Sequence, residues 1–142
     1  MNILKPGYLS EHFSYNELAC HHCGKYRLDR AFVDILEQMR TEYGGPMIIN
    51  SWYRCPDYNA TLGSGTNGPH TTGRAVDIRI VNTTEAFALL QLALKYGFTG
   101  IGVFSPQLAQ IKSMPKWGSG YLHIDHLDAA KYPRPRLWTY SA

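Results

Sequence analysis

The chain of 142 residues contains no run of about 20 apolar residues, the length that a helix needs to cross a membrane. Its first segment, residues 1 to 12, also lacks the apolar stretch that forms the centre of a secretory signal. We therefore expect a protein without a membrane span that is synthesised in the cytoplasm without a signal peptide.

Blocks of like charge, low-complexity tracts and internal repeats are absent from the sequence as well. The 14 basic and 11 acidic residues are scattered and leave a net charge of +3, which by itself does not indicate a nucleic-acid partner. The 13 glycines and 8 prolines are spread along the chain and indicate many turns. The length fits one hydrophobic core, so we expect residues 1 to 142 to form a single domain.

Cysteine is scarce, since the chain has 3 in all, at Cys20, Cys23 and Cys55. An odd number of thiols cannot all pair within one molecule, which argues against a secreted fold stapled by disulfides. The Cys-x-x-Cys pair, with an adjacent histidine and the distant Cys55, could bind a second, structural metal. A disulfide is an alternative, and so are free thiols that pack as small apolar side chains.

A cysteine-based zinc finger that binds nucleic acid is another interpretation of these thiols. Such a module needs a basic recognition helix. The helix that we expect after the first two cysteines is not basic, because it carries Asp34, Glu37 and Glu42 as well as Arg40. We therefore expect no nucleic-acid partner.

Helical spacing of apolar residues predicts two principal helices. The first covers residues 29 to 43, with Asp29 as its N-cap and Gly44 directly after its end. The second covers about residues 83 to 96, and its apolar side is expected to consist of Phe87, Leu90 and Leu94. Residues 56 to 69 are rich in Gly, Asn and Pro, which predicts a long loop.

Alternating polarity predicts strands and also the faces on which their side chains lie. In residues 74 to 80 the apolar side chains alternate with Asp77, which therefore points away from the apolar face. By the same alternation, His123 and Asp125 point away from their apolar neighbours. Further strands are expected at residues 47 to 51, 98 to 104 and 136 to 140. Together these elements predict an α+β fold with a largely antiparallel sheet and two principal helices.

His70, Asp77 and His123 are the residues with the clearest chemical meaning. Structural zinc sites are usually closed by four protein ligands, whereas two imidazoles and one carboxylate leave one position free. A zinc ion with a free position lowers the pKa of a bound water to about 7 and polarises a carbonyl group. The three residues therefore predict one catalytic zinc ion and metal-assisted hydrolysis.

Such a hydrolase also needs a general base close to the free position of the metal. Asp125 shares the strand face of His123 and is the predicted base. His126 points the opposite way in a regular strand, so it is an alternative base, or even a ligand, if the strand ends or bulges there.

Three segments and one single residue carry a recognisable pattern: Ser51-Trp-Tyr-Arg-Cys-Pro56, Asn59, Gly68-Pro-His-Thr-Thr-Gly-Arg-Ala-Val-Asp-Ile78 and Gly120-Tyr-Leu-His-Ile-Asp125. In this order they resemble the zinc D-Ala-D-Ala carboxypeptidase and peptidoglycan endopeptidase family, which has the hedgehog/DD-peptidase fold. Residues 9 to 18 resemble the entry segment of its small phage-type members, and residues 137 to 140 resemble their closing strand. The resemblance therefore covers nearly the whole chain.

The resemblance implies that His70, Asp77 and His123 are the zinc ligands. It also implies that Arg54 binds a carboxylate of the substrate, for which the fork of a guanidinium group is well suited. Aromatic residues are expected to line the substrate groove, with packing in the core as the alternative for some of them, namely Trp52, Tyr53, Trp117 and Tyr121.

The chain departs from the family pattern at two places. Relatives commonly have serine two residues before the first ligand, where this chain has Gly68. Well-studied relatives also carry Glu or His just before the third ligand, as E-x-x-H or H-x-H, where this chain has Gly120 and Tyr121. These departures leave the position of the general base open, with Asp125 favoured.

The function implied by the resemblance is that of a zinc metallopeptidase, a D,D-carboxypeptidase or an endopeptidase. Its substrate would be an amide bond in the peptide stem or cross-link of bacterial peptidoglycan, and which bond is cut stays open. An endolysin-like enzyme of this kind would act as a monomer on the cell wall, in the periplasm or delivered by a virion. The alternative is a non-catalytic zinc-containing module of the same fold that binds the cell wall.

Overall fold

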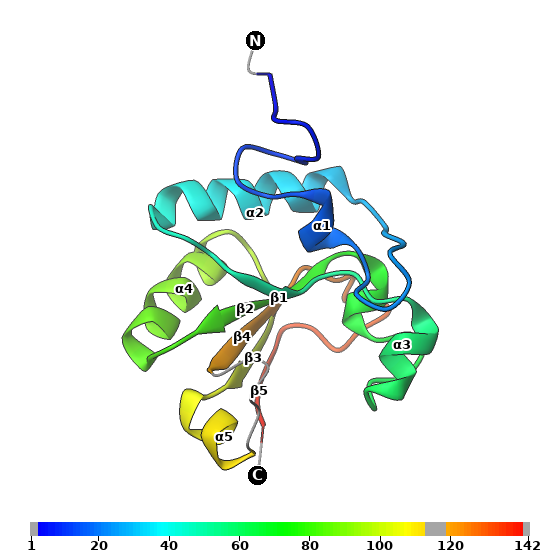
Figure 1. Cartoon of the computed structure of the whole chain (residues 1–142). Helices are drawn as coiled ribbons and strands as arrows, with labels where there is room; N and C mark the ends of the chain where they lie inside the picture. The colour runs from blue at the N-terminus through cyan, green and yellow to red at the C-terminus, as the bar shows by residue number, and fades with distance from the viewer. Residues whose placement is uncertain (1–2, 113–118, 141–142) are drawn as a thin grey trace.

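The computed structural model describes residues 3–112 and 119–140 and contains one five-stranded sheet in the order β1-β2-β4-β3-β5 (Figure 1). The strands are β1 (Ile49–Ser51), β2 (Ala75–Ile80), β3 (Gly100–Phe104), β4 (Gly120–Asp125) and β5 (Arg136–Thr139). β4 lies in the middle and pairs antiparallel with both β2 and β3, and β1 is antiparallel to β2. The predicted α+β class with a largely antiparallel sheet is confirmed.

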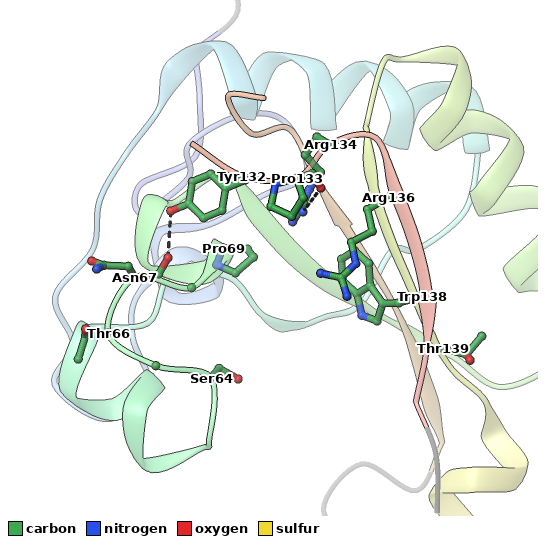
Figure 2. Close-up of a pocket in the computed structure, with 12 residues that line it drawn as sticks. Ser64, Thr66, Asn67, Pro69, Tyr132, Pro133, Arg134, Arg136, Trp138 and Thr139 are labelled. Carbon is green, nitrogen blue, oxygen red and sulfur yellow. Dashed lines mark hydrogen bonds between the residues drawn. The ribbon is translucent and has the colours of Figure 1, made fainter. Parts of the chain in front are cut away.

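β5 is the exception, because it runs parallel to β3. The chain before β5 passes close to the glycine-rich loop at residues 64 to 68, and the hydroxyl of Tyr132 donates a hydrogen bond to the carbonyl of Asn67 over 3.0 Å (Figure 2). The C-terminal strand thus closes the sheet next to a loop that precedes it by about half the chain.

The helical elements are α1 (Tyr15–Leu18), α2 (Arg30–Tyr43), α3 (Pro56–Thr61), the 3-10 helix η1 (Pro69–Thr72), α4 (Thr83–Lys95) and α5 (Pro106–Ile111). α2 and α4 are the two predicted principal helices. Asp29 caps α2 by accepting a hydrogen bond from the backbone N–H of Phe32 over 2.9 Å, and Gly44 ends it in the left-handed conformation. Within the described residues, no helix is both long enough and apolar enough to cross a membrane.

Two details of the sequence-based prediction are wrong. Residues 56 to 69 are not one loop, because Pro56 occupies the first turn of α3, where its missing N–H has no cost. The apolar side of α4 is also different: Phe87 and Leu94 are exposed, whereas Leu89 and Ala93 are buried. α4 is apolar around most of its circumference, so its sequence period could not determine which side meets the core.

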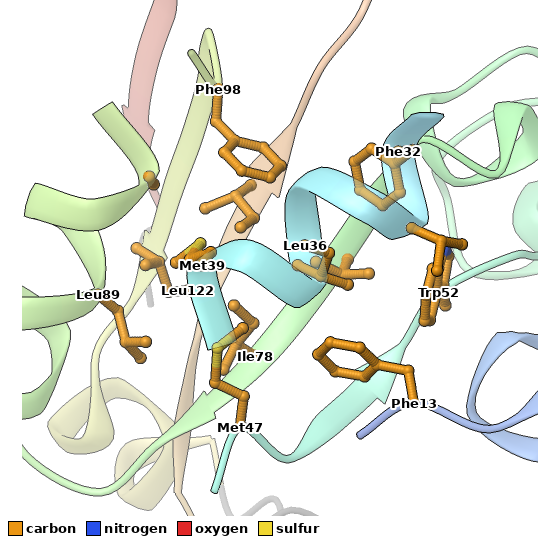
Figure 3. Packing of buried hydrophobic residues seen from close by; sticks show 14 of the residues in the cluster. Phe13, Phe32, Leu36, Met39, Met47, Trp52, Ile78, Leu89, Phe98 and Leu122 are labelled. Carbon is orange, nitrogen blue, oxygen red and sulfur yellow. The ribbon is translucent and has the colours of Figure 1, made fainter. Parts of the chain in front are cut away.

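The core lies between the two long helices and one face of the sheet (Figure 3). α2 contributes Phe32, Leu36 and Met39, and β2 and β4 contribute their alternating apolar side chains. Trp52 also belongs to this core: it is 1% exposed, and its indole N–H donates to the carbonyl of Gly73 over 2.9 Å. Of the two interpretations of Trp52, core packing is therefore the one that the structure supports, while Trp117 lies outside the described residues.

Gly73 connects this core to the segment that carries His70. A substitution at Gly73 tests the close packing of this segment against residue 27. Gly73 and Gly97 have similar backbone angles, with φ of +77° and +81°. A Cβ at Gly97 would meet nothing within 4 Å, whereas one at Gly73 would collide with the carbonyl of Arg27. We expect Gly97→Ala to cost about 1 to 2 kcal/mol of unfolding free energy through its left-handed backbone alone. Gly73→Ala should cost about 1 to 3 kcal/mol more.

Urea unfolding of the two variants measures this difference. Equal losses of stability would contradict the close approach of residues 27 and 73.

Candidate metal centre

Three side chains from separate parts of the chain converge on one point. Asp77 on β2 and His123 on β4 are direct cross-strand partners, and η1 brings His70 beside them. The carboxylate oxygen Oδ1 of Asp77 lies 2.9 Å from Nδ1 of His123 and 3.2 Å from Nε2 of His70. All three residues are buried, and one donor atom from each lies within 4.8 Å of the others. The three residues predicted as ligands are thus brought together.

Each imidazole is oriented by a second hydrogen bond on its other nitrogen. Nδ1 of His70 lies 2.6 Å from the carbonyl of Trp52, which can only accept, so the proton sits there and the lone pair of Nε2 faces Asp77. Nε2 of His123 lies 2.8 Å from Oδ2 of Asp125, which leaves the lone pair of Nδ1 facing Asp77. In their neutral forms, two imidazoles that are held from behind, together with the carboxylate of Asp77, fit the requirements of a divalent zinc ion.

The electrostatics of the cluster favour a cation at its centre. Burial by itself would raise the pKa of Asp77, but His70 and His123 hold it well below its usual range. Burial lowers the pKa of His70, and the nearby carboxylate only partly offsets this. Asp77 therefore stays ionised and His70 resists protonation, as a metal ligand must. Burial would lower the pKa of His123, but its hydrogen bonds to Asp125 and Asp77 outweigh this and raise it, so a metal ion at this position would displace a proton from His123.

Asp125 lies behind His123 and not beside Asp77. Its side chain is fully buried, and the guanidinium of Arg134 binds it in a bidentate manner, with Nε 2.8 Å from Oδ1 and Nη2 2.7 Å from Oδ2. Burial would raise the pKa of Asp125, but hydrogen bonds from Arg134 and His123 lower it below its usual range. A Cβ at Gly100 would collide with this carboxylate, so the space around it is closed. The sequence had given no indication of Arg134, which belongs to none of the recognised segments.

His126 is directed elsewhere. Its ring packs against Phe98, with ring centroids 6.3 Å apart, and the side chain of Arg74 binds its Nδ1. Among the described residues, His126 is not one of those that line the cleft over the metal cluster.

The two departures from the family pattern have steric reasons. A Cβ at Gly68 would lie 2.6 Å from Nδ2 of Asn59, which uses this nitrogen to donate to the carbonyl of Gly65 over 2.8 Å. A Cβ at Gly120 would collide with the backbone carbonyl of Phe104. Neither position has room for a side chain. In this backbone, therefore, no residue at position 120 can supply the carboxylate of an E-x-x-H motif.

A cleft of about 510 Å³ opens over the metal cluster. The predicted groove residues Arg54, Tyr53 and Tyr121 line it, and so do His21, Trp138 and Tyr140. Burial, followed by the nearby charge of Asp77, raises the pKa of Tyr121 well above its usual range, so its hydroxyl keeps its proton. Trp138 lies in β5 and Tyr140 directly follows this strand. The two residues are two positions apart, and this spacing is the signal by which sequence reasoning could have placed them on one face.

A second cavity of about 660 Å³ adjoins this cleft and shares Ser64, Pro69 and Trp138 with it (Figure 2). Arg134 and Arg136 lie along its other wall. The cleft therefore continues into a groove that has the charge of Arg136 on its wall, since the charge of Arg134 is paired with Asp125.

The three cysteines form a second cluster, with their sulfur atoms within 4.8 Å of one another. All three are free thiols in the structure. Burial raises the pKa of the Cys20 thiol, but hydrogen bonds from backbone N–H groups of Cys55, Cys23 and His22 outweigh this and lower it to about 7. The pattern Cys-x-x-Cys followed by a distant cysteine thus does bring the thiols together.

Comparison with known proteins agrees with this site. The family model of peptidase M15 matches residues 11–107, which include Arg54, His70 and Asp77. The chain belongs to the peptidase M15 family. Membership implies the hedgehog/DD-peptidase fold and a peptide substrate. The matched region of this M15 chain ends before β4 and does not include His123. The pairing of β4 with β2 places His123 next to Asp77, one of the two candidate ligands inside the matched region. No match was found among curated proteins.

Proposed function

We propose that this M15 chain is a zinc-dependent peptidase that hydrolyses an amide bond in the peptide part of bacterial peptidoglycan. The observation that carries the proposal is the convergence of His70, Asp77 and His123 beneath an open cleft in a chain of a peptidase family. A zinc ion held by these three residues would acidify a water molecule and polarise the scissile carbonyl.

The residues around the ligands hold them in position for this chemistry. The carbonyl of Trp52 fixes the ring of His70, and the carboxylate of Asp125 fixes the ring of His123. We propose that Asp125 acts as a positioning residue, because both of its oxygens are engaged by Arg134 and it is shielded from the cleft. Fixed ring orientation strengthens metal binding, as such supporting hydrogen bonds commonly do.

Arg54 has the position and the free donors to bind a substrate carboxylate. Three of its five N–H groups are accounted for by Ser51, Asn59 and Asp77, at 2.9, 3.1 and 3.2 Å. These bonds fix the guanidinium at the wall of the cleft, and the two remaining N–H groups can face a ligand. Stem peptides of peptidoglycan carry free carboxylates, which such a fork would bind.

Arg54→Lys tests this role, because lysine keeps the charge and loses the fork. We expect kcat/KM for a carboxylate-bearing peptide to fall roughly 10- to 100-fold, the value of a hydrogen-bonded charged contact. The effect should appear mainly in KM, and the bound zinc should be retained. An unchanged KM, measured by initial rates on the same peptide, would remove Arg54 from substrate binding.

The amidated form of that peptide is the matched control. Wild type and variant should differ less on the amide, because it lacks the anion that the guanidinium binds.

Tyr121 supplies a hydrogen-bond donor in the same cleft, since its hydroxyl stays protonated. We propose that this hydroxyl stabilises negative charge that develops on the carbonyl oxygen of the substrate. The basic groove beside the cleft, with Arg136 on its wall, suits the acidic residues of a stem peptide.

Digestion of purified peptidoglycan and of isolated muropeptides by the zinc-loaded protein, followed by mass spectrometry, tests the proposed activity. We expect new peptide ends at one type of amide bond, and the products identify that bond. Absence of cleavage at every pH tested, in protein with stoichiometric zinc, would leave a non-catalytic zinc module that binds the wall.

A further inference from the structure

The cysteine cluster lies beside a segment of the chain that has little buried apolar surface. Every residue from 21 to 28 is exposed, so this segment between α1 and α2 buries no apolar side chain of its own. Segments that cannot bury apolar surface are commonly held by a disulfide or a metal ion. Cys20 and Cys23 lie at the start of this segment, and Cys55 is the N-cap residue of α3.

The backbone around Cys20 already has the shape of a binding loop. The N–H of Gly24 donates to the carbonyl of Cys20 over 2.8 Å, and the N–H of Cys20 donates to the carbonyl of Lys25 over 2.8 Å. Gly24 has a φ of +74°, a conformation that favours glycine. The N–H of Cys55 lies 3.4 Å from the sulfur of Cys20. This tight turn presents two sulfur atoms on one side and stabilises negative charge on one of them.

A fourth donor lies beside one of the three thiols, that of Cys55. Nδ1 of His22 is 4.0 Å from the sulfur of Cys55. The imidazole ring of His22 stacks on Tyr58, with centroids 5.3 Å apart and planes 5° apart, which holds it next to α3. Three thiolates and one imidazole form a standard closed set of ligands for structural zinc.

We propose that Cys20, His22, Cys23 and Cys55 bind a structural zinc ion, separate from the metal centre in the cleft. Four protein ligands leave no free position, so this ion has no catalytic role. The ion would join two parts of the cleft. His21, which lines the cleft, lies between the ligands Cys20 and His22, and Arg54, which also lines it, directly precedes the ligand Cys55. The ion therefore keeps His21 and Arg54 in place at the cleft, and its existence does not depend on the function proposed above.

A disulfide is the competing arrangement, and the geometry favours zinc. One disulfide would leave the third thiol unpaired beside an imidazole, whereas one ion uses all four side chains. Zinc also suits the set because thiolate and imidazole donors select it over magnesium or calcium.

Metal content of two variants tests the proposal. We expect about two zinc ions per chain in wild type purified without chelator. Cys23→Ser should lose about one and keep the ion of the cleft, and His70→Ala should lose about one and keep the sulfur-bound ion. Cobalt substituted into His70→Ala should show the absorption of sulfur-to-cobalt charge transfer, which is absent from Cys23→Ser.

If wild type binds one zinc ion and His70→Ala binds none, the thiols hold no zinc. This result would overturn the second site and leave the peptidase proposal intact. If wild type binds one zinc ion, His70→Ala keeps it and Cys23→Ser loses it, only the cleft site would be overturned. His22→Ala should weaken zinc binding at the thiols, and His12→Ala is its matched control, since His12 instead binds Glu37 over 2.7 Å.

Thiol reactivity in the wild-type protein gives the same answer without a variant that has to fold. We expect the three thiols to resist alkylation until a chelator removes the ion, and then to react together. A count of about one free thiol in denatured, unreduced protein would indicate a disulfide and overturn the proposal.

Discussion

His70→Ala is expected to remove the ion from the cleft and to lower kcat/KM for peptide hydrolysis by about 1000-fold or more. His70 is one of three candidate ligands, and its ring is fixed by the carbonyl of Trp52, so the substitution leaves two of the three ligands. The loss should appear in the catalytic rate and in the zinc content together. Initial rates on a muropeptide and elemental analysis of the same preparation measure both.

His12→Ala is the control for this experiment. His12 is a partly buried histidine whose ring binds Glu37, and it lies outside both clusters. It should keep both the zinc and the activity. Retained activity in His70→Ala would refute the assignment of the cleft as a zinc centre.

Asp125→Asn is expected to destabilise the fold and to weaken metal binding, and the two losses have one cause. The substitution removes the charge that pairs with Arg134, whose side chain is only 5% exposed. Leaving a buried charge without its partner costs about 3 to 5 kcal/mol of unfolding free energy. The ring of His123 also loses its charged support, which should weaken zinc affinity by about 10- to 100-fold. Denaturant unfolding and zinc titration measure the two effects.

Excess zinc separates a positioning role for Asp125 from the role of general base. A positioning residue acts through metal affinity, so saturating zinc should restore most of the activity of Asp125→Asn. A general base acts on the proton itself, so activity would stay low with the site fully loaded, and that outcome would contradict the positioning role. Asp34→Asn, at an exposed position of α2, is the control for the loss of one carboxylate.

The same ion pair gives the stability of the protein a defined pH dependence. The pKa of Asp125 is lower in the folded chain than in the unfolded chain, because Arg134 and His123 donate to the carboxylate. Its contribution to stability is therefore complete at neutral pH and is lost as the pH falls through the folded-state pKa, below the usual range of a carboxyl group.

The sequence by itself determined which three side chains form the metal centre and which face of each strand is polar. Alternation along residues 74 to 80 and around His123 placed the apolar side chains toward the core and the polar ones on the other face. Strand pairing then made Asp77 and His123 neighbours. These features follow from local geometry, because the side chains of any strand alternate whatever lies around it.

Only the tertiary structure decided what each polar residue does. Asp125 shares the strand face of His123 as predicted, yet Arg134, nine residues further on, closes it off behind the ring. The parallel pairing of β5 with β3 brings Trp138 to the cleft, and the buried side of α4 is set by the sheet that it covers. These outcomes depend on contacts between distant parts of the chain, and a local pattern of polarity carries no information about which distant segment will supply the partner.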